Sequence, residues 1–284
     1  MMMGTNHYLL LDGAQIDGLA ARLQELEASP SLHLLYRHSV YEALAEAGPL
    51  LVAVQPRSEL ARVFEQEWQA TAGIWLESDA SEAILVEHLR SLVHARVGGI
   101  NVLLRYYDPR ITRPWLEHET TSQRDLLLGP IRRIRLPDDT PETCLERMSQ
   151  PQPARYNDTP WVTLSQAQLE HMSQARLGEF EQRLLLHVRN FHPACLHNLG
   201  PTEQHQWLAD CRASAASYGY SSGVDVARWA SLLAELGSDF PHAPGHESYR
   251  ALLAQPESLP SHRLDSLILE LQRQTLVKNK ESVA

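Results

Sequence analysis

The sequence predicts an α/β N-terminal domain, with a mixed, partly parallel sheet and helices, followed by an all-helical C-terminal lobe. Short apolar runs alternate with stretches of helical periodicity in the first half, whereas the second half carries helical periodicity alone. A proline-rich stretch separates the two halves. We therefore expect an α/β domain over residues 1–137, a linker over 138–160 and a helical lobe over 161–284.

The apolar runs of the first half have the length of strands and are bounded by turn residues or helical stripes. Because strands that alternate with helices are typical of crossover connections, we expect part of the sheet to be parallel. The predicted strands are 8–11, 49–54, 74–76, 100–107 and 131–136, and the helical stripes lie at 16–26, 60–68 and 82–93.

Apolar residues of the second half recur at spacings of three and four, as on the buried face of a helix. Ser165, with Gln168 three residues later, forms a capping box that predicts the start of a helix reaching Phe191. Thr202 is the expected cap of the next helix, and Gly237 ends another at a C′ position. The lobe is thus a set of helices packed through apolar stripes.

Composition excludes several classes of function. The 284 residues include 25 Lys and Arg against 35 Asp and Glu, a net charge of −10, which argues against a protein that neutralises duplex phosphates. The three cysteines, Cys144, Cys195 and Cys211, make no disulfide framework and favour a reducing compartment. The start lacks a signal peptide, and no stretch approaches the ~20 apolar residues of a membrane span. We expect a cytoplasmic protein that binds neither nucleic acid nor membrane.

The string GYSSG at 219–223 matches the G-x-S-x-G pattern of a hydrolase nucleophile elbow centred on Ser221. An elbow needs an apolar strand before the serine, whereas the preceding residues are small and polar and continue a helix. Ser222, paired with Asp225, instead fits the N-cap of the next helix. A serine hydrolase using Ser221 stays open as an alternative.

His187, His192, Cys195 and His197 carry side chains that can ligate zinc. The separation of His187 and His192 turns about 140° around a helix, away from the single face that a metal pair needs. Asp12-Gly13 lacks a second carboxylate nearby, and no dinucleotide or P-loop fingerprint occurs. We therefore expect no metal, no cofactor and no catalytic set, and hence not an enzyme.

Several strings of the first half together resemble one family. They are YLLLDGAQ at 8–15, GPLLV at 48–52, WLES at 75–78, HLR at 88–90, LLRYYDPR at 103–110 and GPI at 129–131. Their order is similar to that of the type VI secretion effector adaptors, over roughly residues 6–137. The resemblance implies a non-catalytic chaperone that binds a cognate effector, often through its N-terminal region, and helps to load it onto the VgrG spike.

The most specific string contains arginine and tyrosine, which are frequent at interfaces. The candidate partner-binding residues are Arg105, Tyr107, Asp108, Arg110 and Trp115. Asp108 before a proline is also the expected cap of a following helix, and on the predicted strand Arg105 and Tyr107 share a face opposite Tyr106. A buried Arg–Asp pair that holds the strand end is the competing interpretation, and an immunity protein that neutralises a toxin is the competing binding function.

Overall fold

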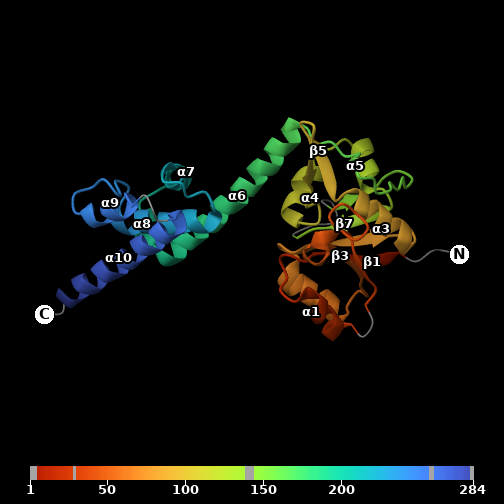
Figure 1. The fold of residues 1–284 in the computed structure, drawn as a ribbon, viewed down its shortest axis with the longest axis horizontal. Coiled ribbons are helices and arrows are strands. Elements are labelled where there is room, and N and C mark those ends of the chain that lie inside the picture. Colours follow the sequence, from red (N-terminus) through yellow and green to blue (C-terminus); the bar gives the residue numbers. More distant parts are fainter. Residues whose placement is uncertain (1–4, 28–29, 138–143, 256–258, 282–284) are drawn as a thin grey trace. The chain divides into compact units, whose positions relative to one another are not determined.

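The structure of the protein is a computed structural model that describes residues 5–27, 30–137, 144–255 and 259–281. The chain forms two compact units, Met1–Arg176 and Leu177–Ala284 (Figure 1). The boundary falls inside helix α6 (Gln166–Phe191), whereas the sequence placed the change at 138–160, of which 138–143 lie outside the described residues. The fold class is confirmed: strands and helices form the first unit and helices the second.

The N-terminal unit is built on a six-stranded sheet in the order β2-β3-β1-β4-β7-β8. Each ladder between neighbours in this order is antiparallel, so the expected parallel pairing is wrong; a parallel contact occurs as an isolated bridge between Arg96 and Thr163. Alternation of strands and helices along a sequence fixes neither the neighbours of a strand nor its direction. The strands are β1 (Asn6–Asp12), β2 (Leu32–Leu34), β3 (Pro49–Ala53), β4 (Gly73–Ser78), β7 (Ile131–Arg135) and β8 (Leu145–Glu146).

Both faces of the sheet are buried, which explains why β1 reads as a continuous apolar run. Leu9 and Leu11 point to one face and Tyr8 and Leu10 to the other, because side chains alternate along a strand. Helix α1 (Leu19–Leu26), helix α2 (Glu59–Val63) and the π-helical turn η2 (Phe64–Trp68) cover the first face. The second face packs against α3 (Glu82–Ser91), α4 (Pro109–Leu116) and α5 (Thr121–Leu128); a 3₁₀ helix, η1 (Glu42–Ala47), precedes β3.

A separate hairpin of β5 (His94–Val97) and β6 (Ile100–Leu103) follows α3. Gly98 and Gly99 form its two-residue turn with φ angles of 53° and 88°, a left-handed conformation that glycine adopts without strain. The predicted strand over 100–107 therefore ends early, at Leu103. From there the chain turns inward, and the Leu104 amide donates to the Val93 carbonyl at 3.0 Å.

The described part of the predicted linker is tied to the N-terminal unit. The β8 strand extends the sheet, and the Ala154 amide donates to His88 Nδ1 at 3.0 Å. Further along, Trp161 Nε1 donates to Ser91 Oγ at 3.0 Å, and the Leu164 amide donates to the Arg96 carbonyl at 2.9 Å. Residues 144–164 thus form an arm that lies against α3 and β5 rather than a free connection.

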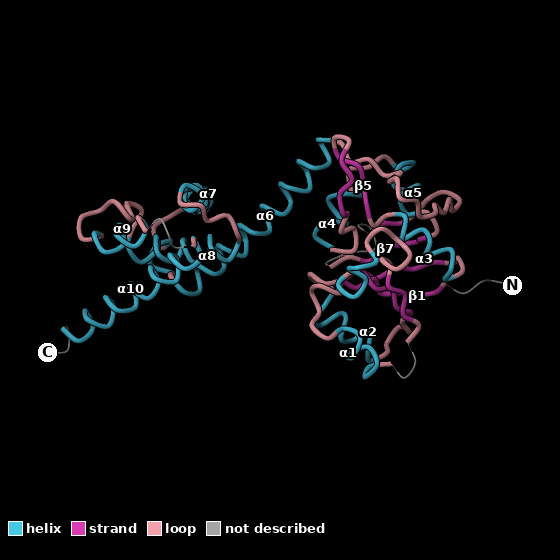
Figure 2. The backbone as a smooth tube through the Cα atoms, viewed as in Figure 1, coloured by secondary structure: helices cyan, strands magenta, loops and turns pink. Residues whose placement is uncertain are grey.

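The C-terminal unit consists of helices and loops (Figure 2). Trp229, Tyr249 and Leu264 are fully buried at its centre. The expected Thr202 cap is wrong, because α7 already begins at Pro201, with Gly200 at the N-cap position. No helix among the described residues is both long and apolar enough to cross a bilayer. Besides α6, the elements are η3 (Pro193–Leu196), α7 (Pro201–Ser217), α8 (Gly223–Leu236), α9 (Glu247–Leu253) and α10 (Pro260–Glu281).

Candidate functional site

The RYYDPR segment, residues 105–110, leads from β6 into α4 and is the centre of the candidate site. It begins as a turn in which the Asp108 amide donates to the Arg105 carbonyl at 3.0 Å. Since the segment is not a strand before Asp108, its side chains do not alternate between two faces. Tyr106 and Tyr107 are both buried, each with about 3% of its surface exposed.

Arg105 forms an ion pair with Asp12, which lies at the end of β1. The Asp12 carboxylate is fully buried, and its second oxygen accepts from the Ala14 amide at 3.0 Å. Burial by itself would lower the pKa of the Arg105 guanidinium, but the charge of Asp12 and the hydrogen bond to it outweigh burial and raise that pKa. The competing interpretation from the sequence placed an Arg–Asp pair at the end of the predicted strand; in the structure Arg105 pairs instead with Asp12 at the end of β1.

Two tyrosine hydroxyls lie beside this ion pair. Tyr107 Oη and Tyr36 Oη are 3.3 Å apart, and the Arg105 guanidinium carbon lies 6.0 Å from the centre of the Tyr107 ring. Burial raises the pKa of Tyr107 and of Tyr36, so both phenols keep their protons at neutral pH. The Tyr36 ring packs directly on Gly48, where a Cβ would collide with it. The two phenols are therefore internal hydrogen-bonding groups.

Asp108 is the N-cap of α4. Its Oδ1 accepts from the Arg110 amide at 3.0 Å, and Pro109 takes the first helical position. The guanidinium of Arg110 returns to the same carboxylate with two bonds of 2.8 and 2.7 Å. Thr112 Oγ1 donates to the Tyr106 carbonyl at 2.6 Å and thus fixes the turn to the helix. The start of α4 is held by charged and neutral bonds together.

Of the five candidate partner-binding residues, two reach solvent. The side chains of Arg105 and Arg110 are 39% and 23% exposed. Tyr107, Asp108 and Trp115 are buried, with Trp115 packed edge-on against Tyr106 at 6.5 Å between ring centres. The indole nitrogen of Trp115 finds no hydrogen-bond partner among the residues that the structure describes. The structure thus gives most of the RYYDPR segment an internal role and leaves its arginines accessible.

The GYSSG string lies between two helices. The residues before it belong to α7, and Ser221 is exposed just ahead of α8. Ser222 Oγ accepts from the Asp225 amide at 3.1 Å and donates to the Asp225 carboxylate at 2.8 Å. Ser222 is therefore the N-cap of α8, and no strand lifts Ser221 out of a sheet in this described region.

The histidines near the end of α6 have separate partners. His187 Nε2 lies 3.2 Å from Ser231 Oγ, and His192 Nδ1 lies 2.6 Å from a Glu235 carboxylate oxygen. The Cys195 thiol donates to the His192 carbonyl at 3.2 Å. Within the described residues, no three His, Cys, Asp or Glu side chains meet as metal ligands would.

Sequence reasoning also missed an internal tie centred on His88 of α3. His88 is fully buried; its Nε2 lies 2.9 Å from the Leu127 carbonyl, and its Nδ1 accepts from the Ala154 amide. Burial lowers the pKa of His88 to about 4, so the ring is neutral. A Cβ at Gly129 would collide with this ring, and Gly129 itself has a φ of 53°. The HLR and GPI strings gave the signal, since these two residues meet.

The candidate site lies within the part of the chain that is similar to a described family of domains. Residues 7–126 match the family of a domain of unknown function, DUF4123, and this range contains Asp12, the RYYDPR segment and Trp115. The Accessory protein VasW of Vibrio cholerae serotype O1 (strain ATCC 39315 / El Tor Inaba N16961) is 27% identical over 268 residues, which cover 91% of this chain and 85% of that protein. No solved structure gives a significant match. The chain is thus similar to this domain family over residues 7–126 and to an accessory protein over most of its length.

Proposed function

We propose that the protein is a cytoplasmic adaptor that binds one cognate type VI effector and helps to load it onto the VgrG spike. The observation that carries the proposal is the extent of the similarity to VasW, which covers 91% of this chain and so includes both compact units. The DUF4123 match adds that the RYYDPR segment lies in the part that a whole family shares. Binding, rather than chemistry, is the proposed activity.

The internal pairing of the RYYDPR segment supports a binding role of a particular kind. Arg105 and Arg110 pair with the carboxylates of Asp12 and Asp108, and the Tyr107 hydroxyl contacts that of Tyr36, so this segment supplies a support instead of reactive groups. Arg105 and Arg110 remain partly exposed on that support, and arginine combines contact area with several hydrogen-bond donors. We propose that these two side chains touch the effector and that the buried residues hold them in place.

The N-terminal region of the effector is the proposed ligand, which allows a direct experiment. The full chain is co-expressed with the neighbouring effector, either intact or without its N-terminal segment, and the complex is isolated on a tagged copy of this chain. The intact effector should co-purify in equal amounts and gain soluble yield, whereas the shortened effector should be lost. An intact effector that never co-purifies would contradict the proposal.

Two rival functions predict different results in the same cells. An immunity protein would rescue cells that express the isolated toxin domain, whereas an adaptor for the N-terminal region would leave them poisoned. A hydrolase would cleave generic esters, and Ser221→Ala would abolish that cleavage. The adaptor proposal expects neither rescue by the chain nor loss of function in the Ser221 variant.

A further inference from the structure

Strand β7 has the sequence IRRIR, and a bulge in the sheet determines where its arginines point. Glu77 pairs with Arg133 in the register with β4, but Ser78 pairs with Ile131, so Arg132 is an extra residue. In a regular strand, Arg132 and Arg133 would point to opposite faces. Here both reach Glu146 on β8, at 3.8 Å from Arg132 and 3.2 Å from Arg133. The bulge thus brings adjacent arginines to one acceptor.

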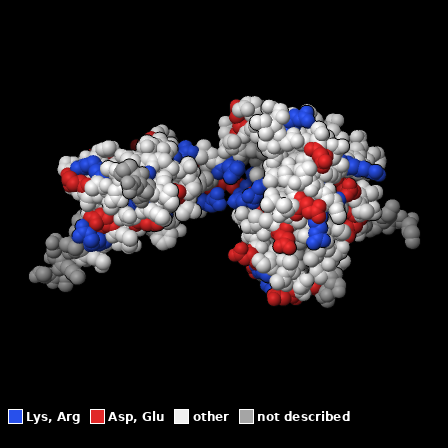
Figure 3. Space-filling view, in the orientation of Figure 1, with Lys and Arg blue, Asp and Glu red and all other residues white. Residues whose placement is uncertain are grey.

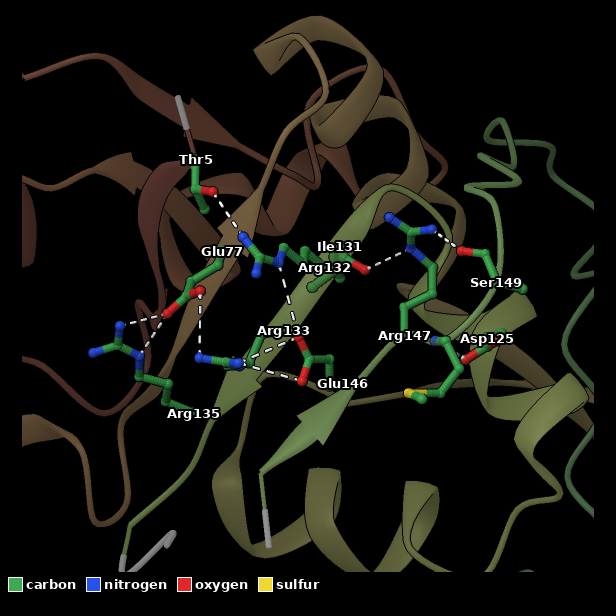
Figure 4. Close-up of polar contacts among 11 residues, drawn as sticks. Thr5, Glu77, Asp125, Ile131, Arg132, Arg133, Arg135, Glu146, Arg147 and Ser149 are labelled. Atoms are coloured by element: carbon green, nitrogen blue, oxygen red, sulfur yellow. Dashed lines mark hydrogen bonds and ion pairs between the residues drawn. The ribbon is translucent and has the colours of Figure 1, made fainter. Parts of the chain in front are cut away.

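Glu77 of β4 forms ion pairs with two of these arginines, Arg133 and Arg135. Its carboxylate is buried, with 5% of the side chain exposed, and it accepts from Arg135 Nε at 2.7 Å. Arg133 Nη1 lies 3.9 Å from the other carboxylate oxygen, and Arg133 Nη2 donates to Glu146 at 3.2 Å. Figure 4 shows the third guanidinium nitrogen of Arg135 pointing away from Glu77. A buried acid therefore orients Arg133 and Arg135 and leaves the outer nitrogen of Arg135 directed away from it, while Arg132 donates to Thr5 Oγ1 at 3.0 Å.

An aromatic ring also holds Arg135. Its guanidinium carbon lies 5.3 Å from the centre of the Trp75 ring, and Trp75 packs edge-on against Phe64 of η2. Trp75 Nε1 donates to His7 Nδ1 at 3.2 Å, so the indole itself is fixed. A stacked and hydrogen-bonded guanidinium loses little side-chain entropy when it binds a ligand. Arg135 is thus prepared for an anionic group.

The surface that results is basic, in a chain with a net charge of −10. The side chains of Arg132, Arg133 and Arg135, which we call the arginine face, are 43%, 31% and 48% exposed. Glu77 is hidden from solvent, whereas Glu146, which pairs with Arg132 and Arg133, is 34% exposed. Figure 3 shows both acidic and basic groups on the visible side of the N-terminal unit.

We propose that the arginine face binds an acidic peptide segment of a protein partner. Guanidinium groups match carboxylates in shape and charge, and the face lies where the short strand β8 ends the sheet. The inference rests on the proposed function for the partner being a protein, and it adds the chemistry of the segment. The three arginines lie outside residues 7–126, the range that matches the domain family, whereas Glu77 and Trp75 lie within it.

An acidic peptide fits this face better than a nucleic acid does. Glu146 would repel the continuous row of phosphates of a nucleic acid. Trp75 is buried, with 4% of its surface exposed, so its ring is not available for a base to stack on. In a peptide whose carboxylates are spaced apart, each carboxylate can pair with one arginine, and a neutral residue can lie next to Glu146. The net negative charge of the whole chain repels an acidic peptide from the rest of its surface, which favours a specific contact at the arginine face.

The test uses the full chain and a fluorescein-labelled peptide of alternating Glu and Ser, with fluorescence anisotropy as the readout. The Arg132→Gln/Arg135→Gln double variant should bind about tenfold more weakly at low salt. The matched control, Arg62→Gln/Arg273→Gln, removes two exposed arginines that also pair with glutamates and should bind as the parent does. Glu146→Gln should bind more tightly, since it removes a competing carboxylate.

Several results would overturn the inference. Equal binding by the parent and the double variant, or equal binding of a Gln–Ser peptide, would show that the face does not recognise carboxylates. Preference for single-stranded oligo-dT would assign the face to nucleic acid instead. If the double variant folds poorly, Arg132→Gln alone replaces it in the test. This single variant keeps the contacts of Glu77 with Arg133 and Arg135, and it should still bind the peptide more weakly than the parent does. The peptide result does not depend on the effector, so its failure and failure of the adaptor proposal are separate outcomes.

Discussion

Arg105 and Asp12 form an ion pair across 93 residues of sequence, which joins the loop before α4 to the end of β1. The pair lies beside the Tyr36–Tyr107 hydroxyl contact, so the two links close the same corner of the N-terminal unit. The RYYDPR segment is thus fixed to β1 in the centre of the sheet. Arg110 is fixed in turn by Asp108 at the start of α4.

Replacing Arg105 with Met should destabilise the protein, because it leaves the Asp12 carboxylate buried without its cation. We expect a loss of about 1–2 kcal/mol, below the value for a fully buried pair because Arg105 is 39% exposed. Arg105→Lys keeps the charge and should recover part of the loss. Urea denaturation measures both variants, and equal midpoints for Arg105→Met and the parent would remove this pair from the account.

His88 should make the stability of the protein depend on pH. Burial lowers its pKa in the folded protein to about 4, from 6.5 for an exposed histidine. Below pH 6.5 the unfolded chain therefore binds a proton that the folded chain refuses, and stability falls as the pH decreases toward 4. His88→Gln can keep both hydrogen bonds but does not titrate, so its stability should vary less over that range.

Trp161→Phe is the matched control for the His88 variant. It removes another hydrogen bond that ties the arm to α3, from Trp161 Nε1 to Ser91 Oγ, without removing a titratable group. Its unfolding free energy should be lower at every pH but should change with pH as the parent's does. If His88→Gln retains the full pH dependence of the parent, His88 is not the group responsible.

Asp108→Ala should cost about 1 kcal/mol through loss of the α4 cap. Asp108→Asn can still accept from the Arg110 amide and loses only the charged bond to the guanidinium, so it should cost less. Thermal unfolding followed by circular dichroism separates the two variants. A melting temperature that is unchanged in Asp108→Ala would show that the cap does not stabilise the helix.

Ser221 and Ser222 should behave differently although they are neighbours. Ser222→Ala removes the bond to the Asp225 amide and should lower stability by about 1 kcal/mol. Ser221→Ala should change neither stability nor effector binding, because Ser221 is exposed and precedes the helix. A fluorophosphonate probe gives an independent check: selective labelling of Ser221 would support the hydrolase alternative against this account.

Local signals predicted most elements of the fold. The apolar runs at 8–11, 49–54 and 131–136 are strands of the central sheet, because a strand buried on both faces needs no polar alternation. Strand direction and order could not be predicted, since both depend on contacts between distant residues. The strand expected over 100–107 ended at Leu103, because apolar and aromatic residues at 104–107 turn into the core and imitate strand composition.

The candidate site shows the same division. The Asp-Pro pair led to a cap at Asp108 because capping acts over a few residues of sequence. The ion pair between Asp12 and Arg105 was beyond reach, since nothing in the local sequence connects residues so far apart. An aspartate directly after a fully apolar strand was the available signal, and it was assigned to a turn. Its Ala14 bond is indeed of turn type, but the carboxylate also serves the RYYDPR segment.

Secretion of the effector tests the adaptor function most directly. The gene for this chain is deleted, and the effector and the VgrG spike protein are measured in the culture supernatant by quantitative immunoblotting. The adaptor account predicts that the effector disappears from the supernatant while the spike protein is still released, and that the full chain supplied in trans restores the effector. Unchanged effector secretion in the deletion strain would contradict the account.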